Sequence, residues 1–98
     1  MTHIVRLREE ADQDLAEAAT WYEQQRQGLG QKFLDEALAI FRAIAAQPMM
    51  YPVLHRSTRR ALISRFPFGV YFRVVDTQIV VLAIMHGSRH PRRWKSRT

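Results

Sequence analysis

The apolar run Ile79-Val-Val-Leu-Ala-Ile-Met85, which leads directly into His86-Gly-Ser-Arg89, decides the fold that this chain adopts. An uninterrupted apolar run of this length is typical of a strand that is buried on both faces of its sheet. The core then holds the end of the strand rigidly, and that end carries a histidine, a glycine and an arginine. We therefore look for function at the end of this strand.

Two helices and three further strands are predicted from the rest of the chain. Apolar residues at helical spacing predict two helices, over 9–26 and 30–46. Gln27-Gly-Leu-Gly30 separates the helices, and Pro48 stops the second one. Alternating or β-branched residues predict three strands, over 3–8, 59–65 and 70–75, and the buried strand covers 78–85. The segment 49–54 is expected to be irregular, because it lies among prolines.

The order β-α-α-β-β-β predicts an α+β fold in a single domain over residues 1–98. Helices joined by a short glycine-containing link form an antiparallel hairpin. The strands form one small antiparallel or mixed sheet. We expect the helical hairpin to cover one face of this sheet and to leave the other face open.

Composition excludes several classes of protein. The chain has no cysteine, so it has no disulfide or thiol chemistry, which suits a reducing cytoplasm. No apolar stretch approaches the ~20 residues that span a bilayer, and the first residues do not resemble a signal peptide. The histidines show no metal-ligand spacing together with carboxylates. We expect a cytoplasmic protein with no membrane partner, no metal and no cofactor.

The net charge of +6 is distributed very unevenly along the chain. Residues 1–48 carry five basic and eight acidic residues, a net charge of −3, whereas residues 49–98 carry ten basic residues and one acid, a net charge of +9. Nine of those ten basic residues are arginines, whose guanidinium groups suit bidentate recognition of phosphate or carboxylate. This half of the chain is expected to bind nucleic acid or an acidic protein, although a merely solvated basic surface is the alternative.

Alternation along the third strand indicates which side chains the open face presents. Val70, Phe72 and Val74 share one face, and Tyr71 and Arg73 share the other. Because the helices cover the more apolar set, we expect Tyr71 and Arg73 on the open face. His86 and Arg89 are expected to reach the same region from the end of the last strand. The alternative is that Tyr71 is a half-buried sheet aromatic and Arg73 a solvated strand residue.

Two features near the C-terminus stay open at this stage. Histidine side chains in general titrate at ~6.5, so His86 is a candidate general acid or base, but a histidine before a glycine is at least as often a turn residue. Trp94 has enough area to anchor the Lys95-Ser-Arg-Thr98 tail, which otherwise stays mobile.

The predicted order and three sequence segments resemble the RelE/ParE superfamily of toxins from bacterial type II toxin–antitoxin modules. The segments are Ala11–Tyr22, Arg59–Arg73 and Ile79–Trp94. The Arg65-Phe-Pro-Phe-Gly69 turn and the His86-Gly-Ser-Arg89 strand end are specific in combination. The resemblance covers nearly the whole chain and implies a helical hairpin on a basic sheet.

The resemblance allows two activities, and the residues bear on which one applies. RelE-like members cleave messenger RNA on the ribosome. Their histidine-type nucleases carry a glutamate after the second helix, an arginine at the start of the third strand and a terminal His-Tyr pair. This chain has Gln47–Tyr51, Phe68-Gly69 and His86-Gly87 at those places. It resembles more closely the ParE-like branch, which inhibits DNA gyrase and often ends its strand with His-Gly-x-Arg.

The resemblance therefore implies a ParE-like gyrase inhibitor that is neutralised by a cognate antitoxin. The alternatives are a ribosome-dependent messenger-RNA endonuclease that uses His86 as acid or base, and a basic scaffold that binds only an antitoxin; whether the chain is an enzyme stays open. The predicted target-binding residues are Arg59, Arg60, Arg65, Tyr71, Arg73, His86 and Arg89. The predicted antitoxin-binding residues come from the broad apolar stripe of the second helix, and they are Phe33, Leu34, Leu38 and Phe41.

Overall fold

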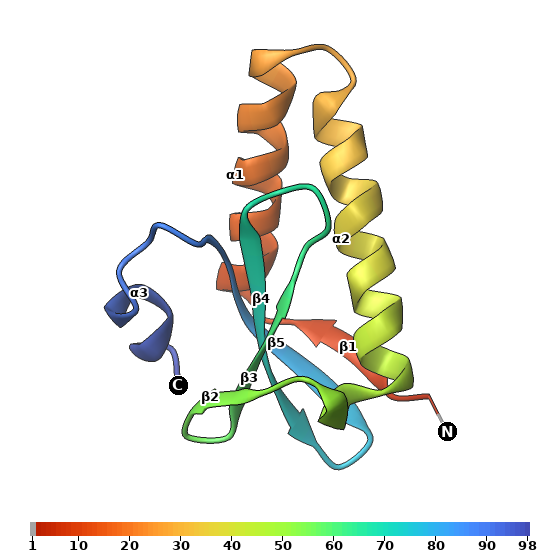
Figure 1. Cartoon of the computed structure of the whole chain (residues 1–98), viewed down its shortest axis with the longest axis vertical. Helices are drawn as coiled ribbons and strands as arrows, with labels where there is room; N and C mark the ends of the chain where they lie inside the picture. The colour runs from red at the N-terminus through yellow and green to blue at the C-terminus, as the bar shows by residue number, and fades with distance from the viewer. Residues whose placement is uncertain (1) are drawn as a thin grey trace.

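The computed structural model describes residues 2–98 and contains one sheet, a hairpin of two helices and a short C-terminal helix (Figure 1). Its elements, in chain order, are β1 (Ile4–Leu7), α1 (Glu9–Gln25), α2 (Leu29–Ala46), the 3₁₀ helix η1 (Pro48–Met50), β2 (Val53–His55), β3 (Thr58–Leu62), β4 (Phe68–Val75), β5 (Gln78–His86) and α3 (Arg92–Lys95). The predicted order of elements is confirmed. Three short elements, η1, β2 and α3, are additional to it.

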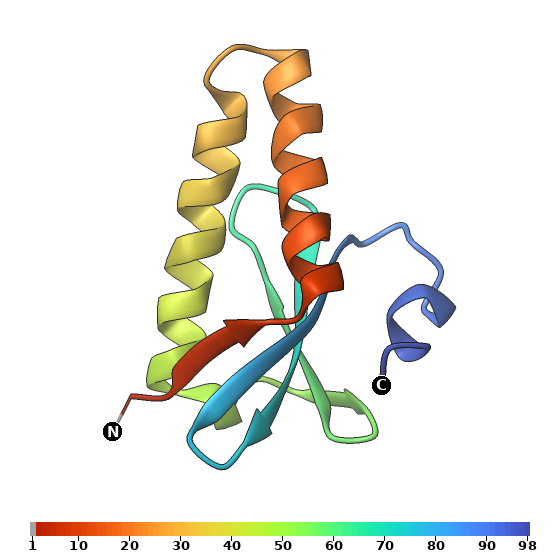
Figure 2. The ribbon, with the colours of Figure 1, turned by 180° about the vertical axis from the view of Figure 1, so that it is seen from behind.

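The strands form one mixed sheet with the spatial order β1-β5-β4-β3-β2. β1 runs parallel to β5, and all other neighbouring strands are antiparallel. The α1–α2 hairpin projects beyond the sheet, and α3 lies at the side, apart from the hairpin (Figures 1 and 2). The predicted α+β fold, with a helical hairpin against a small sheet, is confirmed.

β5 is the buried strand that its sequence predicts. Every residue from Ile79 to Met85 is at most 6% exposed. Its side chains enter two separate clusters, with Ile79, Val81 and Ile84 in the core beneath the helices and Ala83 and Met85 on the opposite face. Burial on both faces is the physical reason that the run lacks polar residues.

A β-bulge in β5 changes the direction of the side chains that follow it. Tyr71 of β4 is opposite Ala83, whereas Phe72 is opposite Val81, so Leu82 has no opposing residue. One extra residue in a strand reverses the alternation beyond it. His86 therefore points to the helix side of the sheet, although alternation from Ile79 without a bulge would direct it to the other side.

The tip of the helical hairpin is held by a carboxylate and by a close approach of the two helices. Both Gly28 and Gly30 donate their backbone N–H groups to the Glu23 side chain, at 2.9–3.1 Å, which satisfies free donors at the start of α2. A Cβ at Gly30 would lie 2.6 Å from the Ala19 carbonyl oxygen. Only glycine permits this approach of α2 to α1.

The segment after α2 is more regular than predicted. Its residues form η1 and β2, and the Arg59 guanidinium donates hydrogen bonds to the carbonyl oxygens of Met49 (3.3 Å) and Tyr51 (2.6 Å). These bonds join residues eight and ten positions apart. A local pattern does not reveal them, because they form only when β3 folds beside this segment.

Candidate functional site

The structure does not bring the predicted target-binding residues onto one face. Arg60 is opposite Tyr71 on the face away from the helices, and Arg73 lies on the same face by alternation. Arg59 is instead opposite Phe72, whose side chain belongs to the core beneath the helices. The prediction that these arginines share one face is therefore wrong.

His86 is also on the helix side of the sheet, which corrects its predicted position. It is opposite Phe68, and the two ring centroids are 5.4 Å apart. Phe68 in turn contacts Tyr22 and Phe33 of the helical hairpin. His86 Nδ1 accepts a hydrogen bond from the Ser88 backbone N–H at 3.0 Å. This bond holds the ring against the turn that follows β5, as is common for a histidine at a turn. The bulge in β5 is the reason for this placement.

The C-terminal helix covers the part of the second face around Tyr71, Ala83 and Met85, whereas Leu62 on the same face is 65% exposed. The indole of Trp94 stacks on the Tyr71 ring, with centroids 4.6 Å apart and an angle of 19° between the planes. Trp94 is 6% exposed and Tyr71 is 3% exposed, and they form a cluster with Ala83 and Met85. Tyr71 therefore has no surface for a target, and the prediction of an open aromatic face is wrong.

Arg97 provides a second attachment for the C-terminal segment. Its guanidinium donates to Asp14 of α1 at 2.6 Å and to the Leu82 carbonyl at 3.1 Å, and Asp14 accepts the Ile84 N–H at 3.0 Å. β1 pairs with β5 only as far as Val81, so the next part of β5 has no strand on that side. Asp14 and Arg97 thus form hydrogen bonds with the Ile84 N–H and the Leu82 carbonyl, which a further strand would otherwise form.

Replacing Asp14 with asparagine is expected to lower the free energy of unfolding by about 2 kcal/mol. The two side chains are only 20% and 15% exposed, so their charge-assisted bonds are poorly replaced by water. Urea denaturation measures the loss, and hydrogen exchange at the Ile84 amide should accelerate. The control is Glu17→Gln, an exposed carboxylate on the same helix, which should change stability little. Equal stability of both variants would contradict the role of the ion pair.

A cleft of about 950 Å³ lies between α1 and the segment that follows β5. Its α1 wall includes Glu17 and Trp21, which is 55% exposed, and the opposite wall includes Arg89 and Arg93. His86 also lines the cleft. Arg89 is exposed here, on the helix side of β5, and is therefore separate from Arg60 and Arg73.

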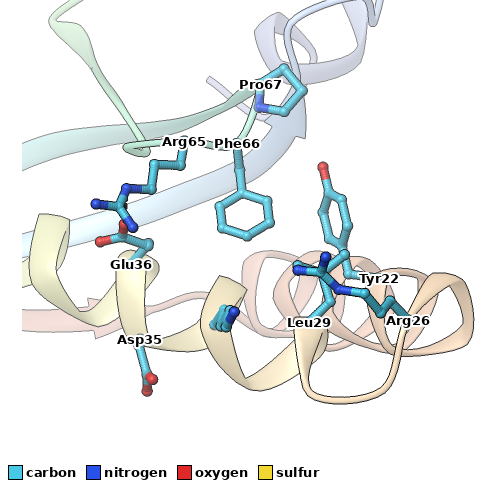
Figure 3. A pocket seen from close by; sticks show the side chains of 9 residues that line it. Tyr22, Arg26, Leu29, Asp35, Glu36, Arg65, Phe66 and Pro67 are labelled. Atoms are coloured by element: carbon cyan, nitrogen blue, oxygen red, sulfur yellow. Dashed lines mark ion pairs between the residues drawn. The ribbon is translucent and has the colours of Figure 1, made fainter.

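A second hollow, of about 630 Å³, lies between the helical hairpin and the loop that joins β3 to β4 (Figure 3). Arg65 is 84% exposed here and its Nε lies 3.7 Å from the Glu36 carboxylate. Its φ of 69° is a turn conformation, so the predicted strand 59–65 ends earlier, at Leu62. The Tyr22 phenol is protonated at neutral pH, and burial raises its pKa further above the ordinary value.

Two polar atoms on the second face of the sheet are buried without a partner. They are Arg73 Nε and Thr58 Oγ1, which have no hydrogen-bond partner among residues 2–98.

Within the same described residues there is no group of three or more histidine, aspartate or glutamate side chains that could hold a metal ion. Over residues 2–98, no helix has the length and apolar character needed to cross a membrane.

The predicted partner-binding stripe on α2 divides into buried and accessible residues. Phe33 is 0% exposed and Phe41 is 9% exposed, and both belong to the core. Contacts within the core already occupy these two side chains, so they are poorly placed for direct contact with a partner. Leu38 is 48% exposed and Leu34 is half-buried, so these two remain accessible.

Sequence reasoning missed an exposed apolar surface on the segment after α2. Four of its side chains are 38–67% exposed, namely Met49, Met50, Val53 and Leu54. The signal in the sequence was an apolar segment broken by prolines, which predicts an irregular loop but not its exposure.

One family model matches the chain, over residues 5–91, and its description is ParE toxin of type II toxin-antitoxin system, parDE. No curated protein sequence matches.

Solved structures that are similar in fold include two chains from toxin–antitoxin systems. A chain of the chromosomal ParDE TA system from P. aeruginosa has a TM-score of 0.77 and 18% sequence identity, covering 87% of this chain and 96% of that chain. A chain of the toxin-antitoxin complex RelBE2 from Mycobacterium tuberculosis has a TM-score of 0.64 and 20% identity, covering 88% of this chain and 99% of that chain.

Proposed function

Because the chain belongs to the ParE toxin family of type II toxin–antitoxin systems, we propose that it inhibits DNA gyrase and that a cognate antitoxin neutralises it. The family match over residues 5–91 is the observation that carries this proposal. The similar fold of a ParDE chain agrees with it. On this proposal the chain forms no covalent bond with its target, and it acts by binding.

The surroundings of His86 support gyrase inhibition over messenger-RNA cleavage. Catalysis of RNA cleavage by a histidine is more efficient when an acidic group orients its ring and a cation stabilises the charge on the phosphate. His86 Nδ1 instead accepts a bond from Ser88, and the ring packs against Phe68. Arg60 and Arg73 lie on the opposite face of the sheet, so the nuclease alternative would leave phosphate binding beside this ring to Arg89 and Arg93, which line the same cleft.

Exposed arginines are the proposed contacts with the target. Arg65 and Arg89 are both exposed. Each of them lines one of the two hollows beside the helical hairpin. Gyrase in complex with DNA presents phosphate and carboxylate groups, which guanidinium groups bind in bidentate fashion. Arg73 is a weaker candidate, because its Nε is buried.

The purified chain is expected to inhibit gyrase supercoiling and to leave ribosome-bound messenger RNA uncut. Arg65→Glu combined with Arg89→Glu should weaken inhibition at least about tenfold, because both charges reverse at the contact surface. Titration of each protein into a supercoiling assay measures this loss. Arg42→Glu, which alters an exposed arginine on α2, is the matched control and should inhibit normally.

His86→Ala separates the two activities in the same assays. A gyrase inhibitor should keep its inhibition when this ring is removed from a folded protein. Messenger cleavage by the wild-type chain that disappears in His86→Ala would overturn the proposal in favour of the RelE-like nuclease.

A further inference from the structure

The cleft between α1 and the segment that follows β5 has two chemically different walls. One wall carries Trp21 and Glu17 of α1, and the other carries Arg89 and Arg93. The volume of the cleft is about 950 Å³, within the ~300–1,000 Å³ that is typical of small-ligand sites. The proposed function uses Arg89 but none of the other three side chains. A ligand that matches both walls has a planar apolar part and an anionic part.

Trp21 offers a flat apolar surface on the α1 wall. Its side chain is 55% exposed, and every other phenylalanine, tyrosine and tryptophan of residues 2–98 is buried or half-buried. The Tyr22 ring lies edge-on to the indole, with centroids 5.1 Å apart and an angle of 84° between the planes. An exposed indole at the wall of a cleft favours stacking with a planar ring of a ligand.

Glu17 adds hydrogen-bond acceptors beside the indole. It lies four residues before Trp21, so the two side chains share one face of α1. Its Oε1 accepts the Gln13 amide at 3.0 Å, which leaves further accepting capacity on both carboxylate oxygens. Asp14, the other carboxylate that lines the cleft, is already paired with Arg97. Two adjacent N–H groups on a planar ring match the Glu17 carboxylate, and guanine presents such a pair at N1 and N2.

The opposite wall suits a phosphate group. Arg89 and Arg93 are exposed, and neither forms an ion pair within the part of the chain that the structure describes. Guanidinium groups bind phosphate oxygens through pairs of charge-assisted hydrogen bonds. This wall therefore determines the anionic part of the ligand.

Two histidines add neutral donors to the cleft. His86 and His90 both line it, and the Nδ1 of each ring accepts a backbone N–H, from Ser88 at 3.0 Å and from Arg92 at 3.1 Å. A ring nitrogen that accepts a hydrogen bond carries no proton, so in the neutral ring Nε2 carries it. Each histidine can thus donate its Nε2–H to an oxygen of the ligand.

The charge of α1 favours a mononucleotide over a nucleic-acid strand. Glu9–Gln25 contains six acidic residues and no lysine or arginine. A strand that followed the cleft would bring successive phosphates towards these carboxylates, and like charges oppose association. A mononucleotide has one phosphate, which can lie at the arginine wall while its base lies at the α1 wall.

We propose that this cleft binds a free guanine nucleoside monophosphate. The base stacks on Trp21 and donates its N–H groups to Glu17, and the phosphate binds Arg89 and Arg93. The site goes beyond the proposed function and does not rest on it.

Titration with GMP, followed by NMR, tests the proposal on the wild-type chain. The chain has two tryptophans, so their indole N–H resonances separate the cleft from the covered sheet face. GMP should shift the Trp21 resonance much more than that of Trp94, which stacks on Tyr71. Guanosine and inorganic phosphate should each bind at least about tenfold more weakly than GMP, because each makes only part of the contacts.

Substitutions on the two walls should weaken binding of GMP separately. Trp21→Ala should lower the affinity about tenfold or more, as expected for loss of a stacked base. Arg93→Gln should lower it to a similar degree, by loss of a charged phosphate contact. The matched control is Arg92→Gln, because Arg92 is an exposed neighbour on α3 that does not line the cleft. Calorimetry measures each affinity, and circular dichroism should show every variant folded.

Glu17→Gln tests the choice of base. The wild-type chain should bind GMP more tightly than AMP, because adenine lacks the N1–H donor. Glu17→Gln should lose this preference, because a carboxamide has one acceptor oxygen in place of two. Glu10→Gln, which alters an exposed carboxylate of α1 outside the cleft, should keep it.

Three results would overturn the proposal. They are wild-type affinity for GMP in Trp21→Ala, equal affinity of the wild-type chain for GMP and inorganic phosphate, and tighter binding of a single-stranded RNA oligonucleotide than of GMP. Gyrase inhibition by a chain that binds no GMP would overturn this proposal and leave the proposed function standing. Binding of GMP as described by a chain that inhibits no gyrase would do the reverse.

Discussion

Replacement of Trp94 by alanine is expected to lower the free energy of unfolding by about 3–5 kcal/mol, as for other large aromatic side chains removed from a core. The indole is 6% exposed and stacked on Tyr71, and it covers Ala83 and Met85. From Gly87 to Thr98 it is the one buried residue. Its loss should therefore free α3 from the sheet and leave the bonds of Arg97 to Asp14 and Leu82 as an attachment of the segment. Urea denaturation followed by circular dichroism measures the change.

Arg93→Ala is the control for this substitution, because Arg93 is the exposed neighbour of Trp94 on α3. It should change stability by less than about 0.5 kcal/mol. Trp94→Phe keeps an aromatic ring over Tyr71 and should lose less stability than Trp94→Ala. Wild-type stability in Trp94→Ala would show that the segment does not pack on the sheet in solution.

Replacement of Phe33 by alanine is expected to cost about 3–5 kcal/mol as well, from the core beneath the helices. Phe33 is 0% exposed, and its ring is 5.1–5.3 Å from the rings of Tyr22, Phe66 and Phe68. The substitution leaves a cavity where α1, α2 and the β3–β4 loop meet. Thermal denaturation should show a fall in Tm of roughly 12 °C or more, since about 1 kcal/mol shifts a domain of this size by 4–8 °C.

Leu38→Ala is the matched control, because it alters another apolar residue of the same α2 stripe. Leu38 is 48% exposed, so its loss should cost less than about 1 kcal/mol. Leu38 and Leu34 remain candidates for contact with the antitoxin, and calorimetric titration of Leu38→Ala with the antitoxin tests this. A larger loss of stability in Leu38→Ala than in Phe33→Ala would contradict the arrangement of α2 against the sheet.

Because Trp94 packs on Tyr71, the arginines in the second half of the chain do not line one open sheet face as the sequence had predicted. Arg59 binds carbonyl groups of the protein itself, and Arg97 binds Asp14, so both have structural roles. Tyr71 is a packing partner of Trp94. On the proposed function, target binding is left to exposed arginines such as Arg65 and Arg89. A large net charge therefore does not establish a single binding cleft.

Several predictions from the sequence were correct, because they depend on local patterns. The apolar run of β5 is buried on both faces, and the helical periodicity places α1 and α2 within one residue of the predicted limits. The pairing of strands into one sheet followed from their short connections and their order. These features arise from the period of apolar residues along the chain, which a sequence displays directly.

The candidate site was predicted less well, because it depends on contacts between distant residues. Strand alternation assigned Tyr71 to the correct face, but nothing in the sequence showed that Trp94 covers it. His86 was assigned to the wrong face, because the extra residue at Leu82 reverses the alternation. The stripe on α2 showed which residues are apolar, but not which of them the sheet buries.

By itself, the sequence determined the helices, the buried strand, the order of the elements along the chain and the basic character of the second half. The tertiary structure decided which surfaces remain free. Asp14 meets Arg97 across 83 positions, and the closure of one sheet face depends on contacts of this kind. Local patterns record what each residue prefers, whereas access to a surface depends on which distant segments pack against it.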